Sequence, residues 1–186
     1  MPRRNRQRTG DSRQRKPRKE LRVLAVDPGF GRAGVAVIAR VRGNDTLLYS
    51  TCIQTASAAP FPKRLHVVVE TIAALLATYR PNLFALERLY FTSNQKTAMQ
   101  VAEVRGALIA LAAARAIPVV EYGPSEVKVA VTGWGKSGKQ EVMRMLPRLI
   151  TLPDAGKRRL DDEYDAIAIA LTALASVRIR NQELGT

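Results

Sequence analysis

The sequence predicts a single α/β domain, built on a mixed β-sheet with helices on both faces. Three short apolar runs follow one another directly near the start of the chain, which is typical of antiparallel neighbours. Further on, similar short runs alternate with longer segments of helical period, which is typical of parallel strands covered by helices. The length of 186 residues, 46% of them hydrophobic, suits one globular domain.

Five short apolar runs, most of them rich in β-branched residues and bounded by turn residues, predict the strands. The runs are residues 21–26, 33–40, 47–53, 83–87 and 117–122. The first run ends at Asp27-Pro28-Gly29, which predicts a turn after a buried strand. The second and third runs are separated by Gly43-Asn44-Asp45, which predicts a hairpin-like connection.

Helical periodicity fills the remaining segments. In residues 60–79, Leu65, Val68 and Ile72 fall on one helical face, and Pro81 ends the segment. The run VKVAV at 127–131 reads equally well as helix or strand, and a glycine-rich loop follows it at 133–138. The other predicted helices are 94–116, 139–150 and 161–180. The predicted order is therefore β-β-β-α-β-α-β-α-α-α.

The charge is strongly positive and unevenly spread. The chain has 30 Lys and Arg against 16 Asp and Glu, a net charge of +14. Residues 1–20 hold nine basic and two acidic residues and almost no apolar ones, so we predict a disordered tail, followed by a folded domain at 21–180 and a short C-terminal tail at 181–186. A solvated basic tail binds phosphate backbones without reading sequence, which favours a nucleic-acid partner.

Several classes of protein are excluded by residue counts. With Cys52 as the single cysteine and His66 as the single histidine, disulfide frameworks, cysteine-rich zinc sites and histidine metal cages are ruled out, and both residues are expected to be structural. No apolar run approaches the roughly 20 residues that span a bilayer, and the N-terminus lacks the apolar core of a secretory signal. We therefore expect a cytoplasmic protein.

Carboxylates stand in apolar surroundings at three places. Asp27 ends the first strand, although it also suits a turn, and Glu87 ends a run typical of a buried strand, although an edge position would let it reach water. Acids from Asp161 to Asp165 begin an apolar helix, where capping would also favour them. Asp162 and Asp165 share a helical face, but so do Asp161 and Asp165, so spacing does not choose between the first two. Converging carboxylates would suit Mg²⁺ or Mn²⁺, one or two ions, and a metal-dependent nuclease.

Five stretches of the chain, in order, resemble the RuvC family of Holliday junction resolvases, and together they cover residues 21 to about 175. They are LAVDPGFGRAGVAVI (24–38), FALERLYF (84–91), VAEVRGALIALA (101–112), VVEYGPSEVKVAVTGWGKSGKQEVMRML (119–146) and DDEYDAIAIAL (161–171). The resemblance implies a ribonuclease-H-like fold with a five-stranded sheet, a homodimer, and Mg²⁺-dependent cutting of two opposed strands of a four-way DNA junction in recombination and repair. It also implies a bacterial cytoplasmic setting and the RuvA-RuvB branch-migration complex as a partner.

The resemblance assigns roles to individual residues. It implies that four carboxylates are catalytic and hold the metal, and its D-x-x-D-A spacing selects Asp162 over Asp161. These four residues are Asp27, Glu87, Asp162 and Asp165. Lys128 and Lys139 match lysines that act near the scissile phosphate, and Tyr90 matches an aromatic residue at the junction centre. With Phe91 beside Tyr90, we further expect DNA contacts from Phe91, Arg88, Arg105 and Lys136.

The chain departs from the family pattern at a few positions. Glu163 and Tyr164 are bulkier than the usual small pair, and Glu163 could alter the charge of the site. Arg88 stands where glutamine is commoner, and the basic tail is outside the pattern. Trp134, the only tryptophan, lies in the glycine-rich loop, where contact with DNA and simple packing are both open. The helix at 94–116, rich in small apolar residues, is the candidate dimer interface.

Three other functions compete with this one. Residues 133–139 satisfy the phosphate-loop pattern G-x₄-G-K, but Gln140 replaces the Ser or Thr that would bind Mg²⁺. Actin-like kinases share the Asp-x-Gly turn but need two such domains. A catalytically silent junction-binding protein would have the same fold, and the intact carboxylates argue against it because without metal they would repel phosphates.

Overall fold

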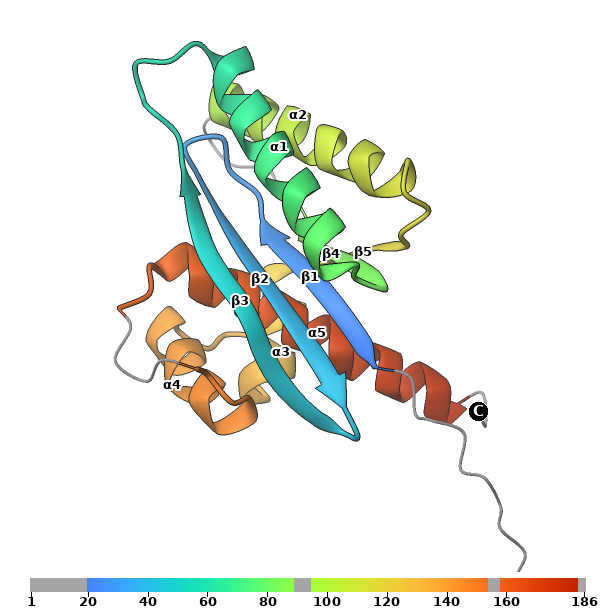
Figure 1. Ribbon diagram of the computed structural model, residues 1–186. Helices are drawn as coiled ribbons and strands as arrows, with labels where there is room; N and C mark the ends of the chain where they lie inside the picture. Colours follow the sequence, from blue (N-terminus) through green and yellow to red (C-terminus); the bar gives the residue numbers. More distant parts are fainter. Residues whose placement is uncertain (1–19, 89–94, 154–157, 184–186) are drawn as a thin grey trace, which may run out of the picture.

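A computed structural model describes residues 20–88, 95–153 and 158–183 of the chain. Its centre is a five-stranded sheet in the order β3-β2-β1-β4-β5 (Figure 1). The strands are β1 (Leu21–Asp27), β2 (Arg32–Val41), β3 (Asn44–Gln54), β4 (Leu83–Glu87) and β5 (Val119–Tyr122). The pairs β1–β2 and β2–β3 are antiparallel, whereas β1–β4 and β4–β5 are parallel. The predicted mixed sheet is confirmed.

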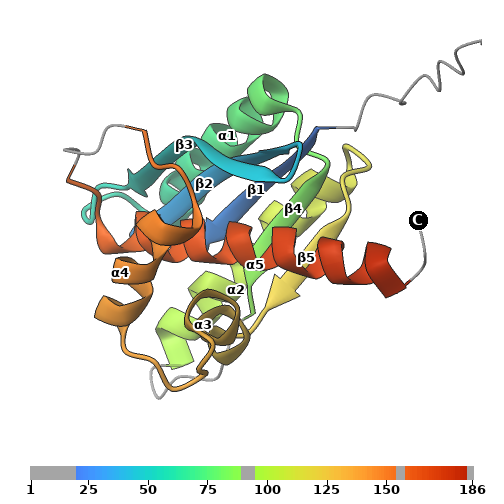
Figure 2. The ribbon, with the colours of Figure 1, turned by 90° about the horizontal axis from the view of Figure 1, so that it is seen from below.

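Helices cover both faces of this sheet (Figures 1 and 2). The helices are α1 (Phe61–Tyr79), α2 (Gln95–Ala113), α3 (Pro124–Thr132), α4 (Lys139–Leu149) and α5 (Asp161–Glu183). One face packs against α1 and α2, and the other packs against α3, α4 and α5. The order of elements is the predicted one. The ambiguous run VKVAV is helical, and its Val127 and Val131, four residues apart, are the buried positions of α3.

The central strands are buried on both faces because their side chains alternate between two cores. In β1, Val23 and Ala25 pack in the core that contains α5, whereas Leu24 and Val26 pack in the core that contains α1. Their neighbours in β4, from Leu83 to Leu86, are buried as well. A carboxylate placed at the end of either strand is therefore held by a rigid and dry support.

The hairpin between β2 and β3 is tighter than the sequence predicted. Arg42 and Gly43 occupy its two central positions with φ values of 53° and 89°, and Val41 pairs with Asn44. Two consecutive residues at positive φ match the twist of a two-residue hairpin. Asp45, which was expected in the turn, therefore lies in β3, where its carboxylate pairs with Arg40 on the neighbouring strand.

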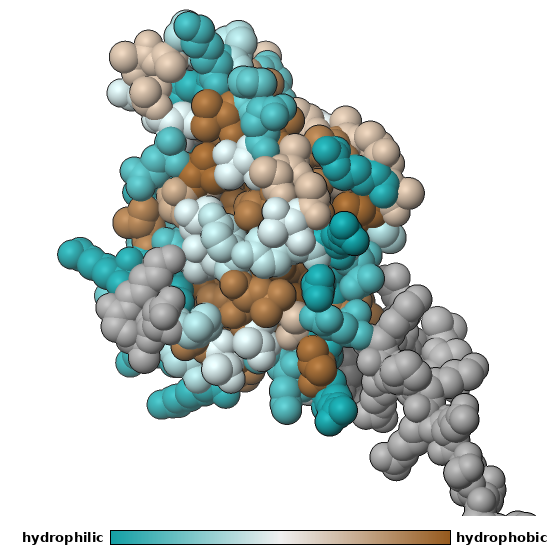
Figure 3. All heavy atoms as spheres, viewed as in Figure 1, coloured by the Kyte–Doolittle hydropathy of each residue, from teal (hydrophilic) through white to brown (hydrophobic). Residues whose placement is uncertain are grey.

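Hydrophobic residues on the face shown in Figure 3 form patches interrupted by hydrophilic ones. Within the part of the chain that the structure describes, no helix has the length and apolar character needed to cross a membrane.

Candidate functional site

Asp27 and Glu87 lie side by side at one edge of the sheet. They end the parallel neighbours β1 and β4, whose last register pair is Val26 with Leu86. Parallel strands bring their carboxyl ends to the same edge, so the two side chains meet there, and the charge of Glu87 is one of the causes that raise the pKa of Asp27.

Helix α5 brings the other two predicted carboxylates to this edge. Its first turn carries Asp162 and Asp165, and the helix packs across β1 and β2. Close approach depends on Gly34 of β2, because a Cβ atom added there would lie 1.8 Å from the backbone oxygen of Asp162. Gly34 is also the register partner of Asp27. The glycine therefore places the start of α5 directly beside the end of β1.

The pKa values of Asp27, Glu87 and Asp165 are raised. Burial raises the pKa of Asp27 from 3.8 to about 7, and the charges of Glu87, Asp165 and Asp162 add to the effect. Burial, followed by the charge of Asp165, raises the pKa of Glu87, and burial raises that of Asp165. The four acids are thus close enough to oppose one another's ionisation, which is the electrostatic condition that a bound cation would relieve.

Two cations border the cluster. Lys139 places its Nζ 2.8 Å from Oδ2 of Asp165 and 3.6 Å from Oδ2 of Asp161. Burial lowers the pKa of Lys139, but the carboxylates of Asp165 and Asp161 outweigh burial and raise it overall. On the other side, Arg32 Nε lies 3.3 Å from Oδ2 of Asp162. Sequence reasoning missed Arg32, although its place at the start of β2, two residues before Gly34, would have pointed to it once the register was known.

The donor set suits a divalent metal ion of the hard type. All four groups are carboxylates, the preferred ligands of Mg²⁺ and Mn²⁺, and the raised pKa values of Asp27, Glu87 and Asp165 mark a cluster that lacks balancing charge. Among the described residues, no three His, Cys, Asp or Glu side chains converge tightly enough to hold an ion as they stand. The residues therefore fit a metal by their chemistry and grouping, and their side chains would have to move closer together to bind it.

A cavity of about 190 Å³ opens beside the cluster. Its lining includes the carboxylates of Glu87 and Asp165 and the lysines Lys128 and Lys139, with Val127 among the apolar residues of the wall. Helices α3 and α4 supply the two lysines, so the loop between these helices joins both to the site. The structure thus brings together all four predicted carboxylates and both predicted lysines.

Glu163, the departure from the family pattern, does not join this cluster. It is buried, its Oε2 accepts a hydrogen bond from Ser50 Oγ of β3 at 2.9 Å, and its Oε1 accepts one from the backbone N–H of Leu160. The side chain therefore helps to fix the start of α5 on β3. Cys52 of the same strand lies 3.8 Å from Asp162 Oδ2, and burial, then the Asp162 charge, raises the pKa of its thiol to about 11.

The other residues expected to touch DNA are placed differently. Lys136 is exposed in the glycine-rich loop, and Arg88 is half-exposed, with its guanidinium 3.4 Å from Glu126 Oε2. Arg105 is largely buried and ion-paired with Glu121, so it is committed to a contact within the protein. Its contact with DNA stays a prediction. Tyr90 and Phe91 lie outside the described residues, as does the basic tail up to residue 19.

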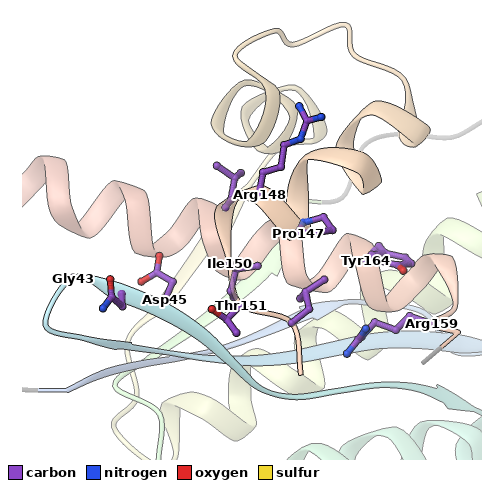
Figure 4. Close-up of a pocket in the computed structure, with 11 residues that line it drawn as sticks. Gly43, Asp45, Pro147, Arg148, Ile150, Thr151, Arg159 and Tyr164 are labelled. Atoms are coloured by element: carbon purple, nitrogen blue, oxygen red, sulfur yellow. The ribbon is translucent and has the colours of Figure 1, made fainter. Parts of the chain in front are cut away.

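Two observations argue against other locations for the functional site, namely the glycine-rich loop and a larger cavity. The glycine-rich loop follows helix α3 and not a strand, so the strand–loop–helix context of a phosphate-binding loop is missing. A larger cavity, about 680 Å³, lies between the β2–β3 turn and the C-terminal end of α4, where residues such as Gly43, Pro147 and Ile150 line it (Figure 4). None of the four predicted carboxylates lines that cavity. The smaller cavity, which Glu87, Asp165, Lys128 and Lys139 line, is therefore the candidate active site.

Comparisons with known proteins agree with this geometry. A family model described as "Crossover junction endodeoxyribonuclease RuvC" matches residues 23–173. The protein of that name from Leifsonia xyli is 42% identical over 152 residues, which span 81% of this chain and 72% of the relative. The Thermotoga petrophila protein of the same name is 38% identical over 151 residues, 81% of this chain and 90% of the relative.

Solved structures are similar as well. A structure described as Thermus thermophilus RuvC in complex with a Holliday junction substrate has a TM-score of 0.78 and 30% sequence identity, covering 86% of this chain and 96% of that one. The yeast mitochondrial Holliday junction resolvase has a TM-score of 0.62 at 16% identity, covering 82% of this chain and 77% of that one, and shares the fold. The ribonuclease-H-like architecture is therefore confirmed.

Proposed function

This chain belongs to the RuvC family of crossover junction endodeoxyribonucleases, and on that premise we propose that it resolves four-way DNA junctions by metal-dependent hydrolysis of two opposed strands. The observation that carries the proposal is the meeting of Asp27 and Glu87, at the ends of adjacent parallel strands, with Asp162 and Asp165 on α5. Such a cluster beside two lysines suits metal-dependent phosphodiester hydrolysis.

We propose that Asp27, Glu87, Asp162 and Asp165 hold one or two Mg²⁺ ions, which Mn²⁺ would replace. When bound, such ions stabilise the attacking and leaving oxygens of a phosphoryl displacement. The protein supplies the fixed geometry: Asp27 and Glu87 are anchored by buried strands, and Asp162 by the close contact of α5 with Gly34. Arg32, paired with Asp162, positions that carboxylate from the solvent side.

The two lysines have a separate task. Lys128 and Lys139 line the same cavity of about 190 Å³ as Glu87 and Asp165. A phosphate entering this cavity would bring negative charge toward both ammonium groups, and Lys139 would exchange part of its contact with Asp165 for the phosphate. Positive charge fixed beside a transferring phosphoryl group stabilises the transition state more than the ground state.

The other predicted residues have proposed roles in binding the DNA. We propose that Lys136 and Arg88 bind phosphates near the cut, that Tyr90 and Phe91 act at the junction centre, and that the basic tail at residues 1–20 holds DNA by counterion release. We keep Arg105 as a candidate DNA contact only if its pairing with Glu121 opens on binding.

We further propose that the chain works as a homodimer. One cluster of carboxylates cuts one phosphodiester, so two symmetric cuts need two copies related by a two-fold axis. Helix α2 remains the candidate interface, and its Met99 is 66% exposed. We also propose a bacterial cytoplasmic setting and the RuvA-RuvB complex as partner, on the strength of family membership. Sedimentation of a monomer at micromolar concentration, with and without junction, would overturn the dimer.

Cleavage of a synthetic four-way junction tests the proposed function directly. The protein should cut the junction at symmetric positions in the presence of Mg²⁺ or Mn²⁺ and leave a duplex of matched sequence intact. Chelation with EDTA should stop the cutting and weaken binding without abolishing it, because the free carboxylates repel phosphate while the basic residues still attract it. Binding without metal-dependent cutting under any divalent ion would instead favour the catalytically silent junction-binding protein.

A further inference from the structure

Trp134, the only tryptophan in the chain, is displayed on the surface. It lies in the loop between α3 and α4, and 59% of its surface is exposed. Val129, in the last turns of α3, is 52% exposed. The loop packs against this valine, because a Cβ atom added at Gly135 would lie 3.3 Å from Val129 Cγ2. Tryptophan is highly buried on average, so one that is 59% exposed, in a loop that packs on the exposed Val129, indicates a contact surface.

The backbone that carries Trp134 is held firmly. Gly133, at φ 81°, ends α3 with its N–H bonded to the Val129 oxygen. Thr132 Oγ1 accepts a hydrogen bond from the Trp134 N–H at 3.2 Å and lies 2.7 Å from Ser137 Oγ. The N–H of the buried Ser137 donates to the Trp134 oxygen at 3.2 Å. The indole is therefore presented from a fixed position, so little order is lost when it makes a contact.

The surroundings of Trp134 are basic. Lys128 lies before it on α3 and Lys139 after it at the start of α4, and both line the cavity that contains Glu87 and Asp165. Lys136, in the same loop, is exposed. An aromatic side chain among lysines matches the way proteins bind unpaired nucleic acid, with lysines on phosphates and aromatic rings on base faces.

We propose that Trp134 stacks on a nucleobase at the centre of the junction, next to the strand that is cut. The inference rests on the proposed function. Where strands exchange partners, a base loses a stacking neighbour on one side and offers a free face, whereas in a duplex arm both faces are covered. The loop lies between the two lysines of the cleavage site, so the base that meets Trp134 is one beside the scissile phosphate. Trp134 thereby adds to the preference for junction over duplex.

The intrinsic fluorescence of the full-length protein tests this contact, because Trp134 is the sole tryptophan. The protein is titrated in EDTA with a synthetic four-way junction and with a duplex of matched sequence. The junction should quench the emission strongly and the duplex weakly. W134A and W134L should weaken junction binding by about 5- to 150-fold, the range that corresponds to loss of one base–aromatic stack, and should change duplex binding little. W134F should stay close to wild type.

The matched control is V67A, which trims another exposed apolar side chain, 45% exposed on α1, on the opposite face of the sheet. It should bind both DNAs as wild type does. The melting temperatures of the Trp134 variants should equal that of wild type, because the side chain is exposed.

Three results would overturn the inference. One is an emission spectrum that the junction does not change. Another is equal binding by W134L and W134F, since stacking needs a ring. The third is a spectrum that varies with protein concentration before DNA is added, which would place Trp134 in a subunit contact. Metal-dependent cutting by wild type is measured in parallel. If the wild-type protein cuts the junction and W134A binds it normally, the stacking contact is wrong and the proposed function is unaffected. If the wild-type protein never cuts but the junction still quenches the emission more than the duplex does, the proposed function is wrong and the stacking contact is supported.

Discussion

Gly34 lies directly beneath the backbone of Asp162, so close that a Cβ atom on Gly34 would stand 1.8 Å from the Asp162 carbonyl oxygen. No side-chain rearrangement relieves a contact with backbone. Helix α5 therefore reaches the end of β1 only because residue 34 has no side chain.

The variant G34A should both destabilise the fold and disable cutting. The added methyl group must push the start of α5 away from β2, at a cost of about 1–3 kcal/mol or more. Chemical denaturation measures the stability and junction cleavage the activity. G106A is the matched control: Gly106 lies inside α2, and an added Cβ would meet nothing within 4 Å apart from the helix's own nearby backbone, so alanine there should stabilise the protein by about 0.5–1 kcal/mol. Equal effects of the two substitutions would contradict the role of Gly34.

Neutralising any one of the four carboxylates should abolish cutting without loss of binding. D27N, E87Q, D162N and D165N should lower the cleavage rate by a factor of about 10³ or more, because each removes a metal ligand. Junction affinity should be unchanged or higher, since a negative charge facing phosphate disappears. A gel-shift assay and single-turnover cleavage give the two quantities. Binding that is lost in step with cleavage would argue against the assignment.

Substitution of the adjacent Asp161 tests whether the position of a carboxylate matters or only the net charge of the helix start. Its side chain is 61% exposed, against 17% for Asp162, and it lies at 3.6 Å from Lys139. D161N should therefore cut nearly as wild type does, although it removes the same charge one residue away. A D161N protein as inactive as D162N would mean that the net charge of the first turn matters, and not the geometry.

The lysines of the cavity should act on rate more than on affinity. K139A and K128A each remove a positive charge beside the transferring phosphoryl group, which should slow single-turnover cleavage by about 10²-fold. Junction binding should weaken much less, because many other cations hold the DNA. K63A, an exposed lysine on α1, is the control and should leave both unchanged. If K139A lost cleavage rate and junction affinity to the same extent, Lys139 would be an ordinary phosphate contact without a role in the chemical step.

Stability without metal should fall as the pH rises. Asp27 keeps its proton up to about pH 7 in the folded chain, whereas its pKa is 3.8 when unperturbed. The folded state therefore binds more protons between these values, so this contribution is complete below pH 4 and is lost as the pH passes through 7. At about 1.4 kcal/mol per pKa unit, the loss is on the order of a few kcal/mol.

Denaturation in EDTA at pH 5 and pH 8 checks this dependence. D27N lacks the titrating group and should lose less stability over the same interval. Mg²⁺ should stabilise wild type more at pH 8 than at pH 5, because the cluster must ionise to hold it. A wild-type protein that is more stable at pH 8 than at pH 5 in EDTA would contradict the prediction.

The basic tail should bind DNA without distinguishing a junction from a duplex. Deleting residues 1–20, which hold nine basic residues, should weaken binding to junction and duplex alike and flatten the salt dependence. The cleavage rate at saturating protein should remain nearly unchanged, since β1 begins at Leu21. If the truncated protein lost its discrimination between junction and duplex, the tail would be reading DNA shape.

Much of the fold was predictable because local patterns and tertiary structure agree. The apolar run that ends at Glu87 is a strand buried on both faces, as its composition indicates. The run VKVAV was ambiguous because its alternation suits a strand, and only packing against α5 shows that Val127 and Val131 form the buried face. The hairpin turn was misplaced because Arg42 adopts positive φ, which its residue type does not announce.

The site was predictable in its residue types and less so in its contacts. Helix geometry left Asp161 and Asp162 equivalent, and the choice of Asp162 rested on resemblance to a family. The partner of Asp162, Arg32, depends on how β2 is registered against β1, which no local pattern records. The requirement for a glycine at position 34 likewise becomes visible only when α5 is packed on the sheet.

The packing of α5 on β1 and β2 joins the last helix of the chain to its first two strands. During synthesis on the ribosome, Asp27 and Glu87 emerge long before Asp162 and Asp165. A nascent chain, or a fragment truncated before residue 162, therefore holds only half of the carboxylates. If these four carboxylates hold the metal as proposed, an unfinished polypeptide would lack half of the metal ligands, and cutting would begin only when the whole domain has been made.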